Sequence, residues 1–207
     1  MEPRRLIFYI DGFNLYFGLR SMGWRKYYWL NLQEMCSRLI RPHQELVKVR
    51  YFTARINQAA EEKRRRQLTY LEALETLPLV DIHYGLYLAS PQTCLKCGHT
   101  FIRHSEKKSD VNIAVKLITD AMEDLYDSAV LISADSDLTP AVDAIKTYFP
   151  EKRVLLFFPP KRSPLSLKKA CHVYGGVLNK TTISKSQLPD TVFSKSGYPL
   201  KRPSHWA

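Results

Sequence analysis

The chain has 207 residues, 45% of them hydrophobic, and a formal net charge of +11. This length fits one domain with a small insertion or tail, and this hydrophobic fraction can build a full core. No apolar stretch approaches the roughly 18–20 residues of a membrane-spanning helix, and the N-terminal MEPRRLIFYIDG lacks the apolar region of a signal peptide. We therefore expect a cytoplasmic protein without a membrane partner.

The excess of Lys and Arg, with a sequence pI near 9.5, favours a polyanionic partner, because basic side chains displace the counterions condensed on nucleic acid. A basic and merely soluble surface is the alternative.

Strand-like and helix-like segments alternate along the chain. The predicted strands are residues 6–10, 46–53, 80–84, 129–133, 153–158 and 172–174, and the predicted helices are residues 13–20, 32–40, 59–77, 109–125, 138–148 and 164–170. Strands separated by helices form parallel β-α-β units with right-handed crossovers. The sequence predicts an α/β fold with a parallel sheet flanked by helices.

Two segments interrupt this alternation. Residues 85–104 carry turn residues and a cysteine pair, which predicts an inserted ribbon. From about residue 184 the Ser, Lys and Pro content rises and periodicity fades, which predicts an extended or poorly ordered tail. We divide the chain into a domain over residues 1–180, with a knuckle inserted at 85–106, and a basic tail over 181–207.

Five polar residues in three separated motifs are the strongest functional signal. They are Asp11 and Asn14 in YIDGFN, Asp110 in EKKSDVNIA, and Asp135 and Asp137 in LISADSDLTP. Two of the motifs follow apolar runs, so their aspartates stand where a strand of an open α/β sheet delivers its last residue to the crevice. Carboxylates gathered there repel one another unless a cation lies among them, and Mg²⁺ or Mn²⁺ prefers such oxygen ligands.

Each acid also has a purely structural interpretation. Asp11 suits a turn or helix cap, with Asn14 completing the capping arrangement, and Asp110 suits the first turn of a helix capped by Ser109. Asp137 precedes Leu-Thr-Pro and also suits a cap, so we rank Asp135 above it. Asp120 lies ten residues beyond Asp110 on the same predicted helix, roughly 15 Å away, and is set aside.

The blocks YIDGFNLYFG, EKKSDVNIAVKLITDA and DSAVLISADSDLTPAV, in this order, resemble the NYN domain, LabA-like branch, of the PIN-like nuclease group. The resemblance spans about residues 5–175. It implies a Rossmann-like (PIN-like) parallel sheet, a Mg²⁺- or Mn²⁺-dependent site and ribonuclease activity. Carried over by motif, Asp11, Asp110 and Asp135 are the expected metal ligands, assisted by Asn14 and Asp137.

We therefore expect a metal-dependent endoribonuclease that hydrolyses single-stranded or loop RNA by in-line attack. The resemblance implies products with 5′-phosphate and 3′-hydroxyl ends. Lys107, Lys108, Lys161, Arg162 and Ser133 are the expected substrate contacts, because they lie next to the acidic motifs or beside a helix start. The alternative is an RNA-binding regulatory module of the same fold that cleaves little.

The segment Cys94-Leu-Lys-Cys97-Gly98-His99 has the form of a metal knuckle. A structural zinc needs two further ligands, for which His99 and His104 are the nearest candidates. The alternative is an idle, reduced cysteine pair on a β-ribbon. Cys36 and Cys171 are expected to be buried.

Two basic segments remain. Residues 63–66, Lys-Arg-Arg-Arg, are expected to form a solvated helical face. Residues 24–29, WRKYYW, interleave aromatic and charged side chains, which is typical of base-stacking surfaces but equally of half-buried aromatics.

Overall fold

The computed structural model describes residues 2–57 and 59–206, except for the side chains of residues 89 and 103–105. The strands are β1 (Arg4–Asp11), β2 (Gln44–Thr53), β3 (Val80–Tyr84), β4 (Leu86–Thr93), β5 (Thr100–Lys107), β6 (Ser128–Ile132), β7 (Arg153–Phe158), β8 (Val173–Val177), β9 (Thr191–Phe193) and β10 (Pro199–Lys201). The α-helices are α1 (Gly12–Ser21), α2 (Leu32–Ser37), α3 (Glu61–Leu74), α4 (Ser109–Met122), α5 (Thr139–Tyr148), α6 (Leu165–Ala170) and α7 (Lys180–Lys185). Short 3-10 turns are η1 (Arg25–Tyr27), η2 (Ser136–Leu138) and η3 (Ser204–Trp206).

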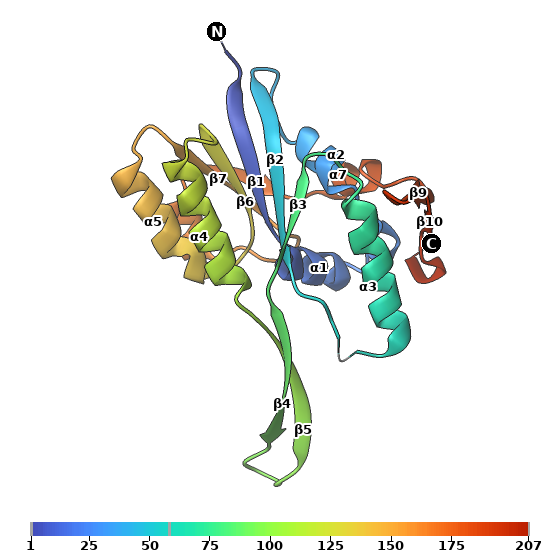
Figure 1. The fold of residues 1–207 in the computed structure, drawn as a ribbon. Helices are drawn as coiled ribbons and strands as arrows, with labels where there is room; N and C mark the ends of the chain where they lie inside the picture. Colours follow the sequence, from blue (N-terminus) through green and yellow to red (C-terminus); the bar gives the residue numbers. More distant parts are fainter. Residues whose placement is uncertain (1, 58, 207) are drawn as a thin grey trace.

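Six parallel strands form the central sheet in the order β3-β2-β1-β6-β7-β8 (Figure 1). The chain builds outward from β1 in one direction as far as β3 and then returns to the other side of β1 with β6. The carboxyl ends of β1 and β6 therefore border the crevice where strand order reverses, which is the usual ligand site of open α/β sheets. The predicted α/β fold with a parallel sheet is confirmed.

Alternation along β1 divides the core into two layers. Ile7 and Tyr9 point to the layer covered by α4, α5 and α6, whereas Leu6, Phe8 and Ile10 point to the layer covered by α1, α2, α3 and α7. All five side chains are at most 1% exposed, because successive residues of a strand face opposite sides of the sheet and both sides are covered here.

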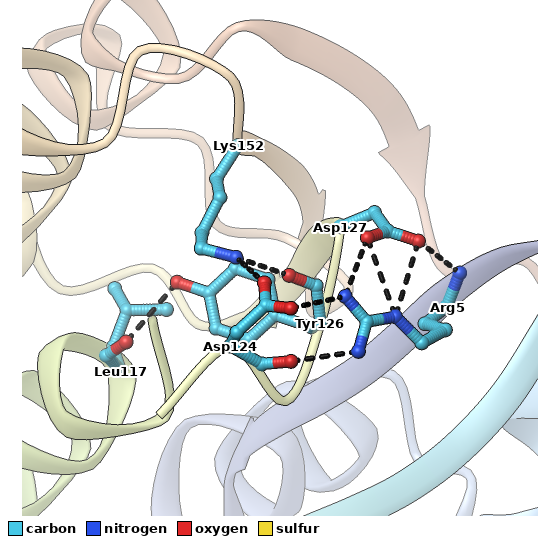
Figure 2. A network of polar contacts seen from close by, with 6 residues as sticks. All are labelled: Arg5, Leu117, Asp124, Tyr126, Asp127 and Lys152. Atoms are coloured by element: carbon cyan, nitrogen blue, oxygen red, sulfur yellow. Dashed lines mark hydrogen bonds and ion pairs between the residues drawn. The ribbon is translucent and has the colours of Figure 1, made fainter. Parts of the chain in front are cut away.

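A polar network closes the amino end of the sheet (Figure 2). Arg5 pairs with Asp127 at 2.8 Å, and the ammonium of Lys152, 3% exposed, donates to Asp124 Oδ1 at 2.6 Å and to the carbonyl of Tyr126 at 2.8 Å. The buried ammonium is thus satisfied by one carboxylate and one carbonyl. This network lies where β1 and β6 begin, at the opposite end of the sheet from the acidic motifs.

A second ionic group is buried beneath α4. Asp120 is fully buried, accepts a 2.7 Å hydrogen bond from the Tyr9 hydroxyl and a 2.9 Å bond from the Arg50 guanidinium, and pairs with Lys116 at 3.1 Å. The charge of Asp120 is compensated within the fold. Its separation from the acidic motifs agrees with setting it aside.

The inserted ribbon is the antiparallel pair β4–β5, which projects away from the body of the molecule (Figure 1). The predicted extended tail is wrong. Residues beyond α7 form the β9–β10 hairpin, and Leu188, Leu200 and Trp206 pack with the buried Trp29 against α3. These contacts come from short strands and loops, so no period marks them in the sequence.

Among residues 2–57 and 59–206, no helix has the length and hydropathy needed to span a bilayer.

Candidate active site

Asp11 is the last residue of β1 and caps α1. It is 2% exposed, and its Oδ1 accepts a 2.9 Å hydrogen bond from the backbone N–H of Asn14. Its Oδ2 accepts from the Asn14 side-chain amide and, at 3.0 Å, from the hydroxyl of Ser133. Burial raises the pKa of Asp11, and these hydrogen bonds oppose that rise because they stabilise the carboxylate. The capping interpretation is therefore correct, and it also fixes the carboxylate at the sheet edge.

The loop after β6 brings the third motif to the same edge. Ser133 is fully buried and its hydroxyl oxygen accepts a 3.1 Å bond from the Asp135 N–H. Asp135 Oδ1 accepts a 2.9 Å bond from the Asp137 N–H and so caps η2. Asp137 itself is exposed. The predicted cap at Asp137 is wrong: Asp135 is the cap, because the chain turns into a 3-10 helix at Ser136, two residues earlier than the predicted helix start.

Asp110 lies in the first turn of α4. Burial, followed by the charges of Asp135, Asp11, Glu106 and Asp137, raises its pKa from 3.8 to about 6. These four carboxylates reach Asp110 from three separate motifs, so the structure brings Asp11, Asp110, Asp135 and Asp137 to one electrostatically coupled edge. We call these residues and Glu106 the acidic cluster.

Glu106, near the end of β5, is a member of the acidic cluster that the sequence interpretation missed. Its Oε1 accepts a 3.0 Å bond from the N–H of Ser109. The predicted cap at Ser109 is wrong: Lys108 is the N-cap residue, with a φ of 78°, and Ser109 is already helical. The left-handed turn at Lys108 folds α4 back on β5, which brings Glu106 beside Asp110. The available signal in the sequence was that Glu106 stands four residues before Asp110, within a run of charged residues.

The acidic cluster suits a hard divalent cation by its donor chemistry, which is carboxylate and amide oxygen. The side-chain oxygen Oδ1 of Asn14 is buried and has no hydrogen-bond partner among the described residues, so it is a free oxygen donor at this edge. Within the described part of the chain, however, no three Asp, Glu, His or Cys side chains are close enough together to hold one metal ion. The acids surround the crevice more widely than a bound cation would hold them.

The predicted substrate contacts do not all lie beside the acidic cluster. Lys107 and Lys108 are exposed and precede α4 directly, so they flank the acidic cluster. The ammonium of Lys161 instead donates to the carbonyl of Ser21, at the last residue of α1. Since α1 starts at Gly12 and rises 1.5 Å per residue, the Lys161 ammonium lies roughly 15 Å from Asp11. Arg162, the next residue, is exposed.

The cysteine pair lies at the far end of the β4–β5 ribbon. Backbone N–H groups of Cys97 and Lys96 lower the pKa of the Cys94 thiol, and Gly98 takes the positive φ of 69° that closes the turn. His99 contributes its carbonyl to Cys94 N–H at 2.9 Å. The side chain of His104, the other expected zinc ligand, lies outside the described residues. Cys36 and Cys171 are buried, as expected.

A hollow of about 690 Å³ opens beside α1 and is lined by residues of that helix, of α3 and of η3. Lys63 and Arg66 line it, so residues 63–66 are not only a solvated face. Tyr28 and Arg25, from the aromatic and basic segment 24–29, also line it, whereas Trp29 is fully buried in the core.

Comparison with known proteins places this site in context. The NYN domain family model matches residues 5–177. A curated relative, the 6-hydroxy-3-succinoylpyridine 3-monooxygenase HspA of Pseudomonas putida, is 25% identical over 99% of this chain and 76% of its own. A crystal structure of a protein of unknown function from Vibrio parahaemolyticus matches with a TM-score of 0.58 and 17% identity, over 86% of this chain and 95% of that one. This last likeness concerns the fold alone.

Proposed function

We propose that this chain, which belongs to the NYN domain family, is a metal-dependent endoribonuclease acting on single-stranded or loop RNA. NYN domains are generally ribonucleases of PIN-like fold, and RNA is the substrate that membership implies. The observation that carries the proposal is the coupling of Asp110 to Asp135, Asp11, Glu106 and Asp137 at the reversal point of the sheet.

Asp11, Asp110 and Asp135 are the residues proposed to hold Mg²⁺ or Mn²⁺, with Asn14, Asp137 and Glu106 around them. A bound ion would have to draw the three carboxylates closer together than they lie here. When bound, such a cation activates water and stabilises charge that develops on the phosphate. Burial, followed by repulsion from the neighbouring carboxylates, raises the pKa of Asp110, and a cation between the carboxylates would relieve that repulsion, which also supports the proposal.

The protein's own groups hold this arrangement in place. Ser133 and Asn14 hold the carboxylate of Asp11 from two sides by hydrogen bonds. Asp135 Oδ1 accepts from the Asp137 N–H, which leaves Oδ2 as the oxygen proposed for the cation. Lys107 and Lys108 would hold the RNA backbone beside the acids, at the same strand-to-helix turn that carries Asp110.

The test is incubation of purified protein with end-labelled RNA and DNA in Mn²⁺, in Mg²⁺ and in EDTA. We expect cleavage of single-stranded RNA that EDTA abolishes and that leaves 5′-phosphate ends. Binding of RNA without cleavage in any of these buffers would favour the alternative, an RNA-binding module of this fold.

A further inference from the structure

The 690 Å³ hollow adjoins the acidic cluster without being part of it. Gly12 and Phe13, the two residues after Asp11, line one end. Its volume lies in the range of about 300–1,000 Å³ typical of small-ligand sites. The hollow thus begins at the residues that follow Asp11 in the chain.

Aromatic rings form the wall that α1 contributes. Phe13, Tyr16 and Phe17 share one face of the helix, at the spacing i, i+3 and i+4. Tyr16 is 42% exposed and Phe17 40% exposed, although the opposite face of α1 is buried in the core. Rings presented to a hollow in this way offer stacking surfaces.

The aromatic surface continues into distant parts of the chain. Tyr28 contacts Tyr16, with ring centroids 5.2 Å apart, and Trp206 lies 5.8 Å from Tyr28 and 6.0 Å from Tyr70. The folded tail therefore closes the hollow through Trp206. A flat ring that enters would therefore meet a continuous aromatic surface, on which Tyr16 and Phe17 are the exposed rings.

Positive charge borders these rings. Arg20 continues the aromatic face of α1 at i+7, and Arg25, Lys63 and Arg66 line the hollow from η1 and α3. Arg66 pairs with Glu62 at 3.3 Å, whereas the side chains of Arg20, Arg25 and Lys63 form no ion pair within the described part of the structure. The site thus offers both ring surfaces and uncompensated cations, which suits an aromatic ring attached to an anion.

The β4–β5 ribbon connects this hollow to the acidic cluster. Tyr87 lines the hollow and stacks on Phe13, with centroids 6.2 Å apart and planes inclined by 12°. Its partner across the ribbon is Glu106, which contacts the start of α4 beside Asp110. The cross-strand pair Tyr87 and Glu106 therefore links the hollow, lined by Tyr87, to the acidic cluster, which contains Glu106.

We propose that the hollow is a base-stacking subsite for a nucleotide of single-stranded RNA adjoining the phosphodiester held at the acidic cluster. This inference rests on the proposed function for its choice of RNA. Stacking on Phe17 and Tyr16 binds any base, because every base has a π-face, and the flanking cations hold the phosphates. The subsite gives affinity for unpaired RNA without sequence preference, and excludes duplexes, whose bases are stacked on each other.

The experiment uses the full chain carrying Asp135→Asn, so that RNA stays intact. Fluorescence anisotropy measures its dissociation constant for a labelled oligoadenylate and for a twin with abasic central positions. We expect the twin to bind more weakly, and Phe17→Ala to weaken the parent about tenfold while leaving the twin nearly unchanged. Tyr16→Ala is the second variant. Tyr148→Ala is the matched control, since this ring is 75% exposed on α5, in the other helical layer.

Equal losses on both oligonucleotides, or none, would overturn the subsite. So would Phe17-dependent binding of a pyridine keto acid, such as 6-hydroxy-3-succinoylpyridine, that oligoadenylate does not displace. A parallel cleavage assay on the wild type separates the two proposals. Base-dependent binding without cleavage supports the subsite and rejects the nuclease, whereas cleavage with base-independent binding rejects the subsite. Thermal unfolding of each variant checks that a loss of affinity is not a loss of fold.

Discussion

The hydroxyl of Ser133 donates a 3.0 Å hydrogen bond to Asp11 Oδ2 and so joins the carboxyl ends of β6 and β1. The two residues are 122 positions apart in the chain. The same hydroxyl oxygen accepts from the Asp135 N–H, which makes Ser133 the bridge between two of the acidic motifs. This bridge stabilises the edge of the sheet. Without it, the buried carboxylate of Asp11 would lose one hydrogen bond, which would destabilise the folded protein.

Asp135→Asn should lower metal-dependent cleavage at least roughly 100-fold, the scale on which loss of one electrostatic group lowers kcat. The fold should persist, because the asparagine oxygen can still accept from the Asp137 N–H. Relief of repulsion with Asp110 should keep or raise the thermal midpoint in EDTA. The measurement is initial cleavage rate beside circular dichroism melting. Wild-type rates from the variant would place the chemistry elsewhere.

Asp110 gives the protein a pH-dependent stability. Its pKa, raised from 3.8 to about 6 by burial and then by Asp135, means that the folded chain binds more protons than the unfolded chain between those values. This group therefore favours folding at low pH and lowers stability as pH rises through about 4 to 6. Asp110→Asn in EDTA should melt higher than the wild type at pH 7, with the difference shrinking towards pH 4. A difference that stays constant across this range would contradict the assignment.

Lys107→Ala combined with Lys108→Gly should weaken binding of every RNA sequence about equally, because interactions with phosphates carry no base information. Glycine is used at position 108 because Lys108 has a φ of 78°. The slope of log affinity against log salt should become shallower by roughly 0.7 for each phosphate that is no longer neutralised. Lys169→Ala, an exposed lysine on α6, is the control. Loss confined to certain sequences would show that these lysines read bases.

Asp120→Asn should destabilise the protein by about 3–5 kcal/mol, because it leaves the 7%-exposed Arg50 without a full counter-charge. Urea unfolding measures this. Cleavage per folded molecule should be retained, since Asp120 lies outside the acidic cluster. A variant of native stability and no activity would show that Asp120 belongs to the site.

Cys94 and Cys97 are predicted to bind one structural zinc per chain. The lowered pKa of Cys94 favours the thiolate that zinc requires. Elemental analysis of protein purified without added metal is the measurement, with Cys94→Ser as the comparison. No zinc, together with two freely titratable thiols, would establish the idle pair.

Local patterns made the sheet and most of the acidic cluster predictable. Asp11 ends an apolar run, as the edge of an open sheet requires, and Asp135 follows another. Glu106 was missed because its role depends on the left-handed turn at Lys108, and nothing in a run of lysines marks a positive φ.

The aromatic hollow was missed for a different reason: it forms only when separate segments of the chain pack together. Phe13, Tyr16, Phe17 and Arg20 repeat at helical spacing on one face of α1, and residues 24–29 carry an aromatic and basic pattern, but neither signal shows that the two segments meet. Tyr28, Lys63, Tyr87 and Trp206 join them from separate segments. Their convergence depends on packing between elements that local periodicity does not describe.

The β4–β5 ribbon is so long that charges at one of its ends do not influence charges at the other. Eight residues of β4, at about 3.3 Å each, put roughly 25 Å between the ribbon's base and the turn that carries the cysteines. Charges are screened over about 8–10 Å at physiological ionic strength. An ion bound or released at Cys94 and Cys97 will therefore leave the titration of Asp110 unchanged. Any influence of the cysteine turn on the crevice must travel mechanically, through the strand pair that holds Tyr87 opposite Glu106.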